Sequence, residues 1–73
     1  MNRIRLTRKE KGYTMKALSR AVGCSNPYMH DVEMGHRKPS KETLAKISSF
    51  LGVPVNELYS MDEKRLKNEN YNS

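Results

Sequence analysis

TMKALSRAVGCSNPYMHDVEMG, residues 14–35, contains two short runs in which apolar side chains recur at the 3.6-residue spacing of an α-helix. Gly23 separates the two runs. In the first run the residues expected to face inward are Met15, Leu18, Ala21 and Val22, opposite Lys16 and Arg20. In the second run Met29 and Val32 are expected to face inward. This stretch therefore predicts two amphipathic helices joined by a tight turn.

Glycines and hydroxyl residues mark helix ends along the rest of the chain. A glycine closes each apolar run, as a left-handed residue after a helix does; these are Gly12, Gly23, Gly35 and Gly52. A hydroxyl residue opens the next run, as an N-cap does; these are Thr14, Ser25 and Ser40. The pattern predicts helices at residues 2–11, 15–22, 26–34 and 41–51, and a fifth at 55–60 that is entered through Pro54.

The 73 residues can form one small hydrophobic core but not two. We therefore expect a compact all-α, five-helix domain over residues 1–60, followed by a polar tail over 61–73 that is partly helical or disordered. Cys24 is the single cysteine, so no internal disulfide can form. No signal or membrane segment is recognised in the sequence, and we expect a cytoplasmic protein.

The net charge of +6 is unevenly distributed. Residues 1–20 carry seven Lys or Arg and one Glu, and residues 36–46 carry four and one, whereas the only charged side chains in 21–35 are Asp31 and Glu33. Clustered cations gain free energy on a polyanion by releasing its counterions. The charge pattern therefore favours nucleic acid as a partner, with basic segments on either side of the second predicted helix of the pair.

Two short helices that cross through a glycine turn have the geometry of a helix-turn-helix, whose second helix enters the DNA major groove. The sequence resembles the Cro and phage-repressor (Xre-like, lambda-repressor-like) helix-turn-helix proteins over roughly residues 3–60. The resemblance rests on five motifs in register: RKEKGYT (8–14), AVGCS (21–25), VEMG (32–35), KPSKETLAKI (38–47) and LGVPVNEL (51–58).

The resemblance implies a structural ion pair between Arg8 and Glu33, with two independent solvated charges as the alternative. Such a pair is expected to fix orientation more than to add stability. Ser19 stands where the family usually has alanine, at the crossing of the two motif helices.

The resemblance also implies which residues contact DNA. Phosphate contacts are expected from Thr14, Met15, Lys16, Arg20, Arg37, Lys38 and Lys41. Base reading is expected from Ser25, Asn26, Pro27, Tyr28, His30 and Asp31. Asn26 can pair with adenine, Asp31 can accept from the cytosine amino group, and Pro27 can make only apolar contact. Two alternatives remain open: Asp31 as a surface charge beside His30 or a lysine, and Tyr28 packed over the first helix.

These features predict a sequence-specific DNA-binding transcriptional regulator, a repressor that binds a (pseudo)palindromic operator as a homodimer through Val55, Leu58 and Tyr59. Two other functions remain open. The chain could be a DNA-binding antitoxin whose C-terminal tail binds a protein partner, or a protein-interaction module on a helix-turn-helix scaffold. No catalytic motif, cofactor motif or paired metal-ligand spacing is present, so neither an enzyme nor a metal site is expected.

Overall fold

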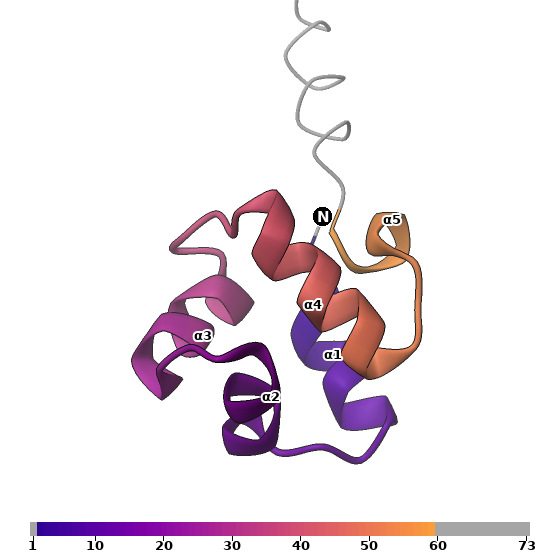
Figure 1. Cartoon of the computed structure of the whole chain (residues 1–73), viewed down its shortest axis with the longest axis horizontal. Helices are drawn as coiled ribbons and strands as arrows, with labels where there is room; N and C mark the ends of the chain where they lie inside the picture. The colour runs from indigo at the N-terminus through magenta and orange to yellow at the C-terminus, as the bar shows by residue number, and fades with distance from the viewer. Residues whose placement is uncertain (1, 60–73) are drawn as a thin grey trace, which may run out of the picture.

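The computed structural model describes residues 2–59, which form five α-helices and no β-strand (Figure 1). The helices are α1 (Ile4–Glu10), α2 (Met15–Val22), α3 (Asn26–Met34), α4 (Lys41–Leu51) and α5 (Val55–Leu58). The predicted all-α, five-helix class is confirmed. Met1 and residue 60 lie outside the described residues, and so does the whole of the predicted tail, 61–73.

Side-chain caps begin the three central helices at the residues predicted. The hydroxyls of Thr14, Ser25 and Ser40 each accept the N–H of the residue three positions later, at 3.0, 3.2 and 3.1 Å. Each bond satisfies one of the amides that a helix start leaves without a partner. Gly23 then ends α2 with φ +83°, a backbone conformation that glycine adopts without steric cost. The start and direction of α3 are therefore set by local chemistry.

The first and last helices are shorter than predicted, because the two ends of the fold pair with each other. Asn2 and Tyr59 form an isolated antiparallel bridge, and the N–H of Arg3 donates to the carbonyl of Leu58 at 2.7 Å. Tyr59 is accordingly extended, with φ −151° and ψ 122°, which ends α5. The Asn2 Oδ1 accepts the N–H of Ile4, so α1 begins there and not at residue 2.

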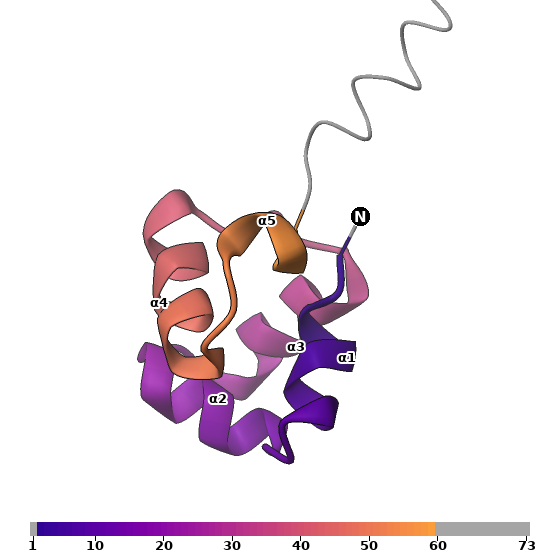
Figure 2. The ribbon, with the colours of Figure 1, turned by 90° about the vertical axis from the view of Figure 1, so that its right-hand side faces the viewer.

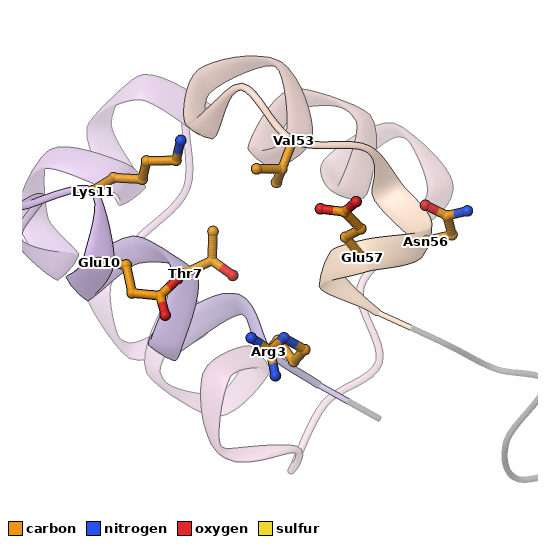
Figure 3. A pocket seen from close by; sticks show the side chains of 7 residues that line it. All are labelled: Arg3, Thr7, Glu10, Lys11, Val53, Asn56 and Glu57. Carbon is orange, nitrogen blue, oxygen red and sulfur yellow. The ribbon is translucent and has the colours of Figure 1, made fainter.

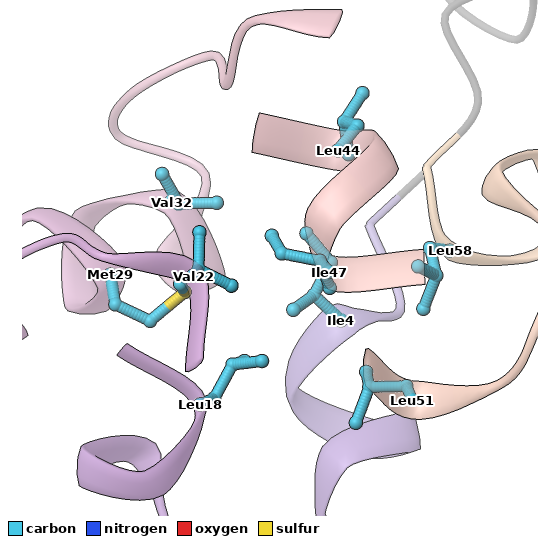
Figure 4. Close-up of a cluster of buried hydrophobic side chains, with 9 residues drawn as sticks. All are labelled: Ile4, Leu18, Val22, Met29, Val32, Leu44, Ile47, Leu51 and Leu58. Atoms are coloured by element: carbon cyan, nitrogen blue, oxygen red, sulfur yellow. The ribbon is translucent and has the colours of Figure 1, made fainter. Parts of the chain in front are cut away.

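The core lies between α4 and the other helices (Figure 4). Its buried side chains come from all five helices: Ile4, Leu18, Val22, Met29, Val32, Leu44, Ile47, Leu51 and Leu58. Ala21 is exposed, so its predicted inward position is wrong. On α1, Thr7 is buried whereas Leu6 is 48% exposed. The register of α1 therefore directs a polar residue inward and leaves its aliphatic neighbour at the surface.

A buried ion pair joins α1 to α3, as the family resemblance implied. Arg8 donates through Nε and Nη2 to the two carboxylate oxygens of Glu33, at 2.8 and 3.1 Å. Its Nη1 donates to the carbonyl of Tyr13 at 2.8 Å. The side chains of Arg8 and Glu33 are 9% and 2% exposed, so neither is a free solvated charge. Because both charges are satisfied away from water, the pair holds α3 at one angle to α1.

We expect Glu33→Gln to lower the free energy of unfolding by about 3 kcal/mol, since the buried guanidinium of Arg8 would lose its countercharge. Urea unfolding monitored by circular dichroism measures this. Glu42→Gln is the matched control, because Glu42 lies 3.7 Å from Lys46 in an exposed pair on α4. That change should cost about 0.5 kcal/mol or less. Equal losses in the two variants would contradict a structural role for the buried pair.

Ser19 is a polar residue at the crossing of α2 with its neighbours. It is 2% exposed, and its hydroxyl has no nitrogen or oxygen hydrogen-bond partner among the described residues. The Cys24 thiol beside it is only a weak hydrogen-bonding group. Burying a hydroxyl without a stronger partner costs free energy in the folded state.

We therefore expect Ser19→Ala to stabilise the fold. Ser49→Ala serves as control, because Ser49 is exposed in α4 and gains only helix propensity, about 0.5 kcal/mol. Ser19→Ala should raise the free energy of unfolding by about 1 kcal/mol more than this control. Thermal and urea unfolding of the two variants compare them. A smaller gain at Ser19 than at Ser49 would mean that its hydroxyl is satisfied in solution.

Candidate nucleic-acid interface

The side of α3 opposite the core is polar and open to solvent. Met29 and Val32 are fully buried, whereas Asn26, Pro27 and His30 are exposed. Tyr28 and Asp31 are half-buried at the margins. Ser25 is exposed and is the N-cap, so its oxygen accepts the N–H of Tyr28. All six residues predicted to read bases thus belong to one helix and its cap.

The chain leaving α3 is fastened to the last turns of that helix. Gly35 has φ +84°, and the carbonyl of Asp31 accepts the N–H groups of His36 and Arg37 at 2.8 and 3.2 Å. The guanidinium carbon of Arg37 lies 5.3 Å from the centroid of the Tyr28 ring. Backbone hydrogen bonds and the contact between Arg37 and Tyr28 therefore hold the loop after α3 against that helix.

The Asp31 carboxylate faces two histidines. Its Oδ1 lies 3.8 Å from Nδ1 of His30 and 3.9 Å from Nδ1 of His36, and its side chain is 43% exposed. These separations are longer than hydrogen bonds. In the free protein Asp31 is thus a surface carboxylate beside His30, which is the alternative left open by the sequence. Its oxygens remain accessible to a donor from outside.

Exposed cations lie on both sides of α3. Lys16 and Arg20 are exposed on α2, and Arg37, Lys38 and Lys41 are exposed in the connection to α4 and at its start. Figure 1 shows α3 at one side of the bundle, with α2 below it and this connection above it. The exposed cations thus belong to the two segments that flank α3, and α3 itself carries only the acids Asp31 and Glu33.

Thr14 and Met15, at the start of α2, differ from these cationic positions. The hydroxyl of Thr14 caps the helix, and Met15 is half-buried against the core. The Met15 thioether cannot donate a hydrogen bond. A contact between Met15 and an anion must therefore use the backbone N–H, one of those that a helix start leaves without an intrahelical partner.

A cleft of about 460 Å³ separates α1 from α5 (Figure 3). Its lining residues are Arg3, Thr7, Glu10 and Lys11 from α1 and its flanks, and Val53, Asn56 and Glu57 from α5 and the preceding loop. The lining includes two cations, Arg3 and Lys11, and two carboxylates, Glu10 and Glu57, so its formal charges cancel. In Figure 2, α1 and α5 lie toward the viewer and α3 lies behind them. The cleft is therefore distinct from the exposed side of α3.

Of the three residues predicted to contact a second chain, Leu58 was assigned wrongly. Its side chain is 0% exposed and completes the core beneath α5, so it is not available to a second chain. Val55 is 37% exposed, and Tyr59 is half-buried. The periodicity of α5 could not reveal which apolar residue of so short a helix faces inward.

Comparison with known proteins decides the family. A helix-turn-helix family model matches residues 4–58, which span all five helices. The chain belongs to this helix-turn-helix family. The resemblance identified in the sequence is confirmed, and α2 and α3 are the two motif helices.

Relatives within the helix-turn-helix family are named as transcriptional regulators. The HTH-type transcriptional regulator DdrOP3 of Deinococcus deserti is 39% identical over 56 residues, which are 77% of this chain and 43% of that protein. The chain spans about half or less of the length of the first curated relatives it matches.

Two solved structures share the fold. The N-terminal DNA binding domain of SinR from Bacillus subtilis has a TM-score of 0.68 and 36% identity, covering 74% of this chain and 80% of that one. The complex of SinR with SinI has a TM-score of 0.69 and 30% identity, covering 97% of this chain and 78% of that one.

The helix-turn-helix turn also contains Cys24, which is half-buried and packs against the core. Burial raises the pKa of the Cys24 thiol, and the neighbouring Ser19 side chain offsets part of this rise. The thiol is thus held in its protonated, weakly reactive form. Within residues 2–59 no three potential ligand side chains converge on a metal site. No helix of the same part has the length and apolar character needed to cross a membrane.

Sequence reasoning missed two contacts of the helix-turn-helix unit. The Nδ2 of Asn2 donates to the carbonyl of Val32 at 2.6 Å, which supports the last turn of α3 from behind. The pairing of Tyr28 with Arg37 was also missed. A lone asparagine gives no periodic signal, and neither does an aromatic–arginine pair that joins a helix to a loop, so pattern alone could not find these contacts.

Proposed function

We propose that the chain binds double-stranded DNA in a sequence-specific manner through α3 and acts as a transcriptional repressor. The observation that carries the proposal is the exposed polar side of α3, bordered by exposed cations on α2 and on the connection to α4. A helix of this kind fits the major groove, and the cations on the neighbouring segments can then contact the phosphates. The DNA binding domain named for SinR supports the same reading. We place the protein in the cytoplasm.

Phosphates are contacted by the cationic border and by one helix start. The side chains involved are Lys16, Arg20, Arg37, Lys38 and Lys41. The start of α2 contributes Thr14 and the backbone of Met15, because oriented N–H groups favour an anion. These contacts set affinity and register but carry no sequence information.

Bases are read by the exposed groups of α3 and its cap. Asn26 offers both a donor and an acceptor to adenine, and Pro27 offers only an apolar surface, suited to a thymine methyl. Asp31 accepts from the cytosine amino group, at the cost of placing a carboxylate near phosphates. Ser25 and His30 complete the exposed set, and Tyr28 lies half-buried at its margin. Because Pro27 can make only apolar contact and Asp31 can only accept hydrogen bonds, these two residues restrict the bases that can lie opposite them.

The operator is (pseudo)palindromic, and the chain binds it as a homodimer. Val55 and Tyr59 make the contact, beside the cleft between α1 and α5. Charge supports this placement: a chain with a net charge of +6 repels its own copies over its basic border, whereas the cleft carries as many carboxylates as cations. A two-fold contact needs such a self-complementary surface. Half-sites would be about 34 Å apart, one helical turn.

A second candidate function is binding of a protein partner, as in an antitoxin or an interaction module. The SinR–SinI complex favours it, because that helix-turn-helix protein is seen with another protein. The polar tail, residues 61–73, is the segment we assign to such a contact.

Selection of bound sequences from a random duplex pool tests the proposed function. Enrichment of one motif, together with affinity that falls steeply with salt, is the expected result, since each phosphate contact contributes about 0.9 to the slope of log affinity against log salt. No enrichment and little binding at low salt would exclude DNA recognition and leave the second candidate.

Lys38→Ala should weaken binding to all duplexes about equally and lower the salt slope by about one, because it removes one phosphate contact. Fluorescence anisotropy over a range of salt concentrations measures both quantities. Lys46→Ala is the control: Lys46 lies beside Glu42 on α4 and belongs to no assigned contact. A loss confined to the selected motif would show that Lys38 reads sequence.

Asp31→Ala should change the selected motif at one or two base pairs, because its carboxylate is the acceptor assigned to cytosine. The loop remains fastened in this variant, since the bonds from His36 and Arg37 use the backbone carbonyl. Repeating the selection gives the readout. His36→Ala, which removes a neighbour of the carboxylate but no assigned base contact, should leave the motif unchanged. The same motif from Asp31→Ala and wild type would remove Asp31 from the base-reading set.

Val55→Glu should shift the monomer–dimer equilibrium toward monomer by at least tenfold, because it buries a carboxylate in an apolar contact. Sedimentation equilibrium measures the association constant. Ala45→Glu makes the same charge change at an exposed position of α4 and should have little effect. Equal dissociation of the two variants would mean that net charge, and not the α5 surface, governs association.

A further inference from the structure

We propose that the Tyr28 ring is a platform that holds the Arg37 guanidinium in position for a DNA phosphate. Tyr28 then acts through Arg37 and does not itself read a base, so it is a positioning residue. This inference rests on the proposed DNA-binding function, and it reassigns one of the six residues, in α3 and its cap, that the family resemblance placed in base reading.

Core packing and a backbone hydrogen bond restrict the position of Tyr28. It lies in the first turn of α3, is half-buried, and packs against the hydrophobic core. Its backbone N–H is held by the Ser25 hydroxyl at 3.2 Å. Packing against the core and the bonded backbone together limit the orientations that the ring can adopt.

The backbone of Arg37 is bonded to the same helix, one turn after Tyr28. Its N–H donates to the Asp31 carbonyl at 3.2 Å, beside the 2.8 Å bond from His36. The left-handed Gly35 turns the chain back at this point. With the backbone held there, the guanidinium carbon of Arg37 lies 5.3 Å from the Tyr28 ring centroid. The contact thus joins the loop after α3 to a residue in the first turn of that helix.

The charge of Arg37 remains available for an external anion. Among residues 2–59 no carboxylate lies within salt-bridge distance of Arg37, and the nearby Asp31 carboxylate faces His30 and His36 instead. Contact with an aromatic ring lowers the freedom of the guanidinium without using its N–H donors. The outcome is a cation with few conformations to lose when it meets a phosphate.

This arrangement separates two chemical roles of tyrosine. A base or phosphate hydrogen bond would need the phenolic hydroxyl, whereas a platform needs only the ring. Tyr28→Phe keeps the platform and removes the hydroxyl, and Tyr28→Leu keeps apolar packing on the core and removes the platform. The two variants therefore discriminate between the roles.

The test is a double-mutant cycle measured by DNA affinity, on the selected motif and on random duplex, with four variants: Tyr28→Phe, Tyr28→Leu, Arg37→Ala and Tyr28→Leu/Arg37→Ala. We expect Tyr28→Phe to bind within twofold of wild type. Tyr28→Leu should bind both duplexes about 2- to 5-fold more weakly, the range of an exposed cation–π contact. In the Arg37→Ala background, Tyr28→Leu should have no further effect, and the selected motif should be that of wild type.

Proton NMR of the DNA-free protein gives an independent readout. Ring-current shifts of the Arg37 side-chain protons should be present in wild type and Tyr28→Phe and absent in Tyr28→Leu. Thermal unfolding shows that each variant is folded at the temperature of measurement.

Three results would overturn the platform while leaving DNA binding intact. These are equal losses in Tyr28→Phe and Tyr28→Leu, an additive loss in the Arg37→Ala background, and a changed base preference in Tyr28→Leu. Absence of DNA binding by wild type would instead overturn the proposed function and this role with it.

Discussion

The buried pair of Arg8 and Glu33 is the interaction on which the position of the recognition helix depends. It links α1 to the last turn of α3 and, through the Tyr13 carbonyl, to the loop that leads into α2. The Tyr13 ring in turn packs on Phe50 of α4, with centroids 4.5 Å apart. One guanidinium thereby joins three parts of a small core. A fold of this size has few other ways to fix a helix that must leave one whole side unpacked.

The helix that faces outward is defined by constraints behind it and at its ends. Ser25 and Gly35 set where α3 begins and ends, Met29 and Val32 anchor it, and Asn2 supports its last turn. None of these groups competes with the exposed polar side chains. Charge follows the same division, because the positive residues lie on neighbouring segments and Glu33 is used internally. An uncharged-to-acidic recognition helix in a basic protein is thus compatible with binding a polyanion.

Local chemistry explains which features could be predicted from the sequence. The caps at Thr14, Ser25 and Ser40 involve partners three residues away, so pattern alone locates them. The Arg8–Glu33 pair spans 25 residues and could be predicted only from the family resemblance. Leu58 was misassigned because its burial depends on how α5 packs, and Ala21 because the apolar face of α2 is narrower than its periodicity suggests. The Tyr28–Arg37 contact joins residues across a helix and a loop, where no fixed spacing applies.

The antiparallel bridge between Asn2 and Tyr59 places the first and last described residues of the fold next to each other. Entry and exit of the chain are therefore at one place, and Figure 2 shows both near the end of α5. A unit with adjacent ends can be inserted into a loop of a larger protein without separating that loop's edges. Adjacent ends also favour circular permutation, in which the two ends are linked and new termini are made at an exposed turn. The adjacent ends thus suit residues 2–59 to insertion into a loop of another protein.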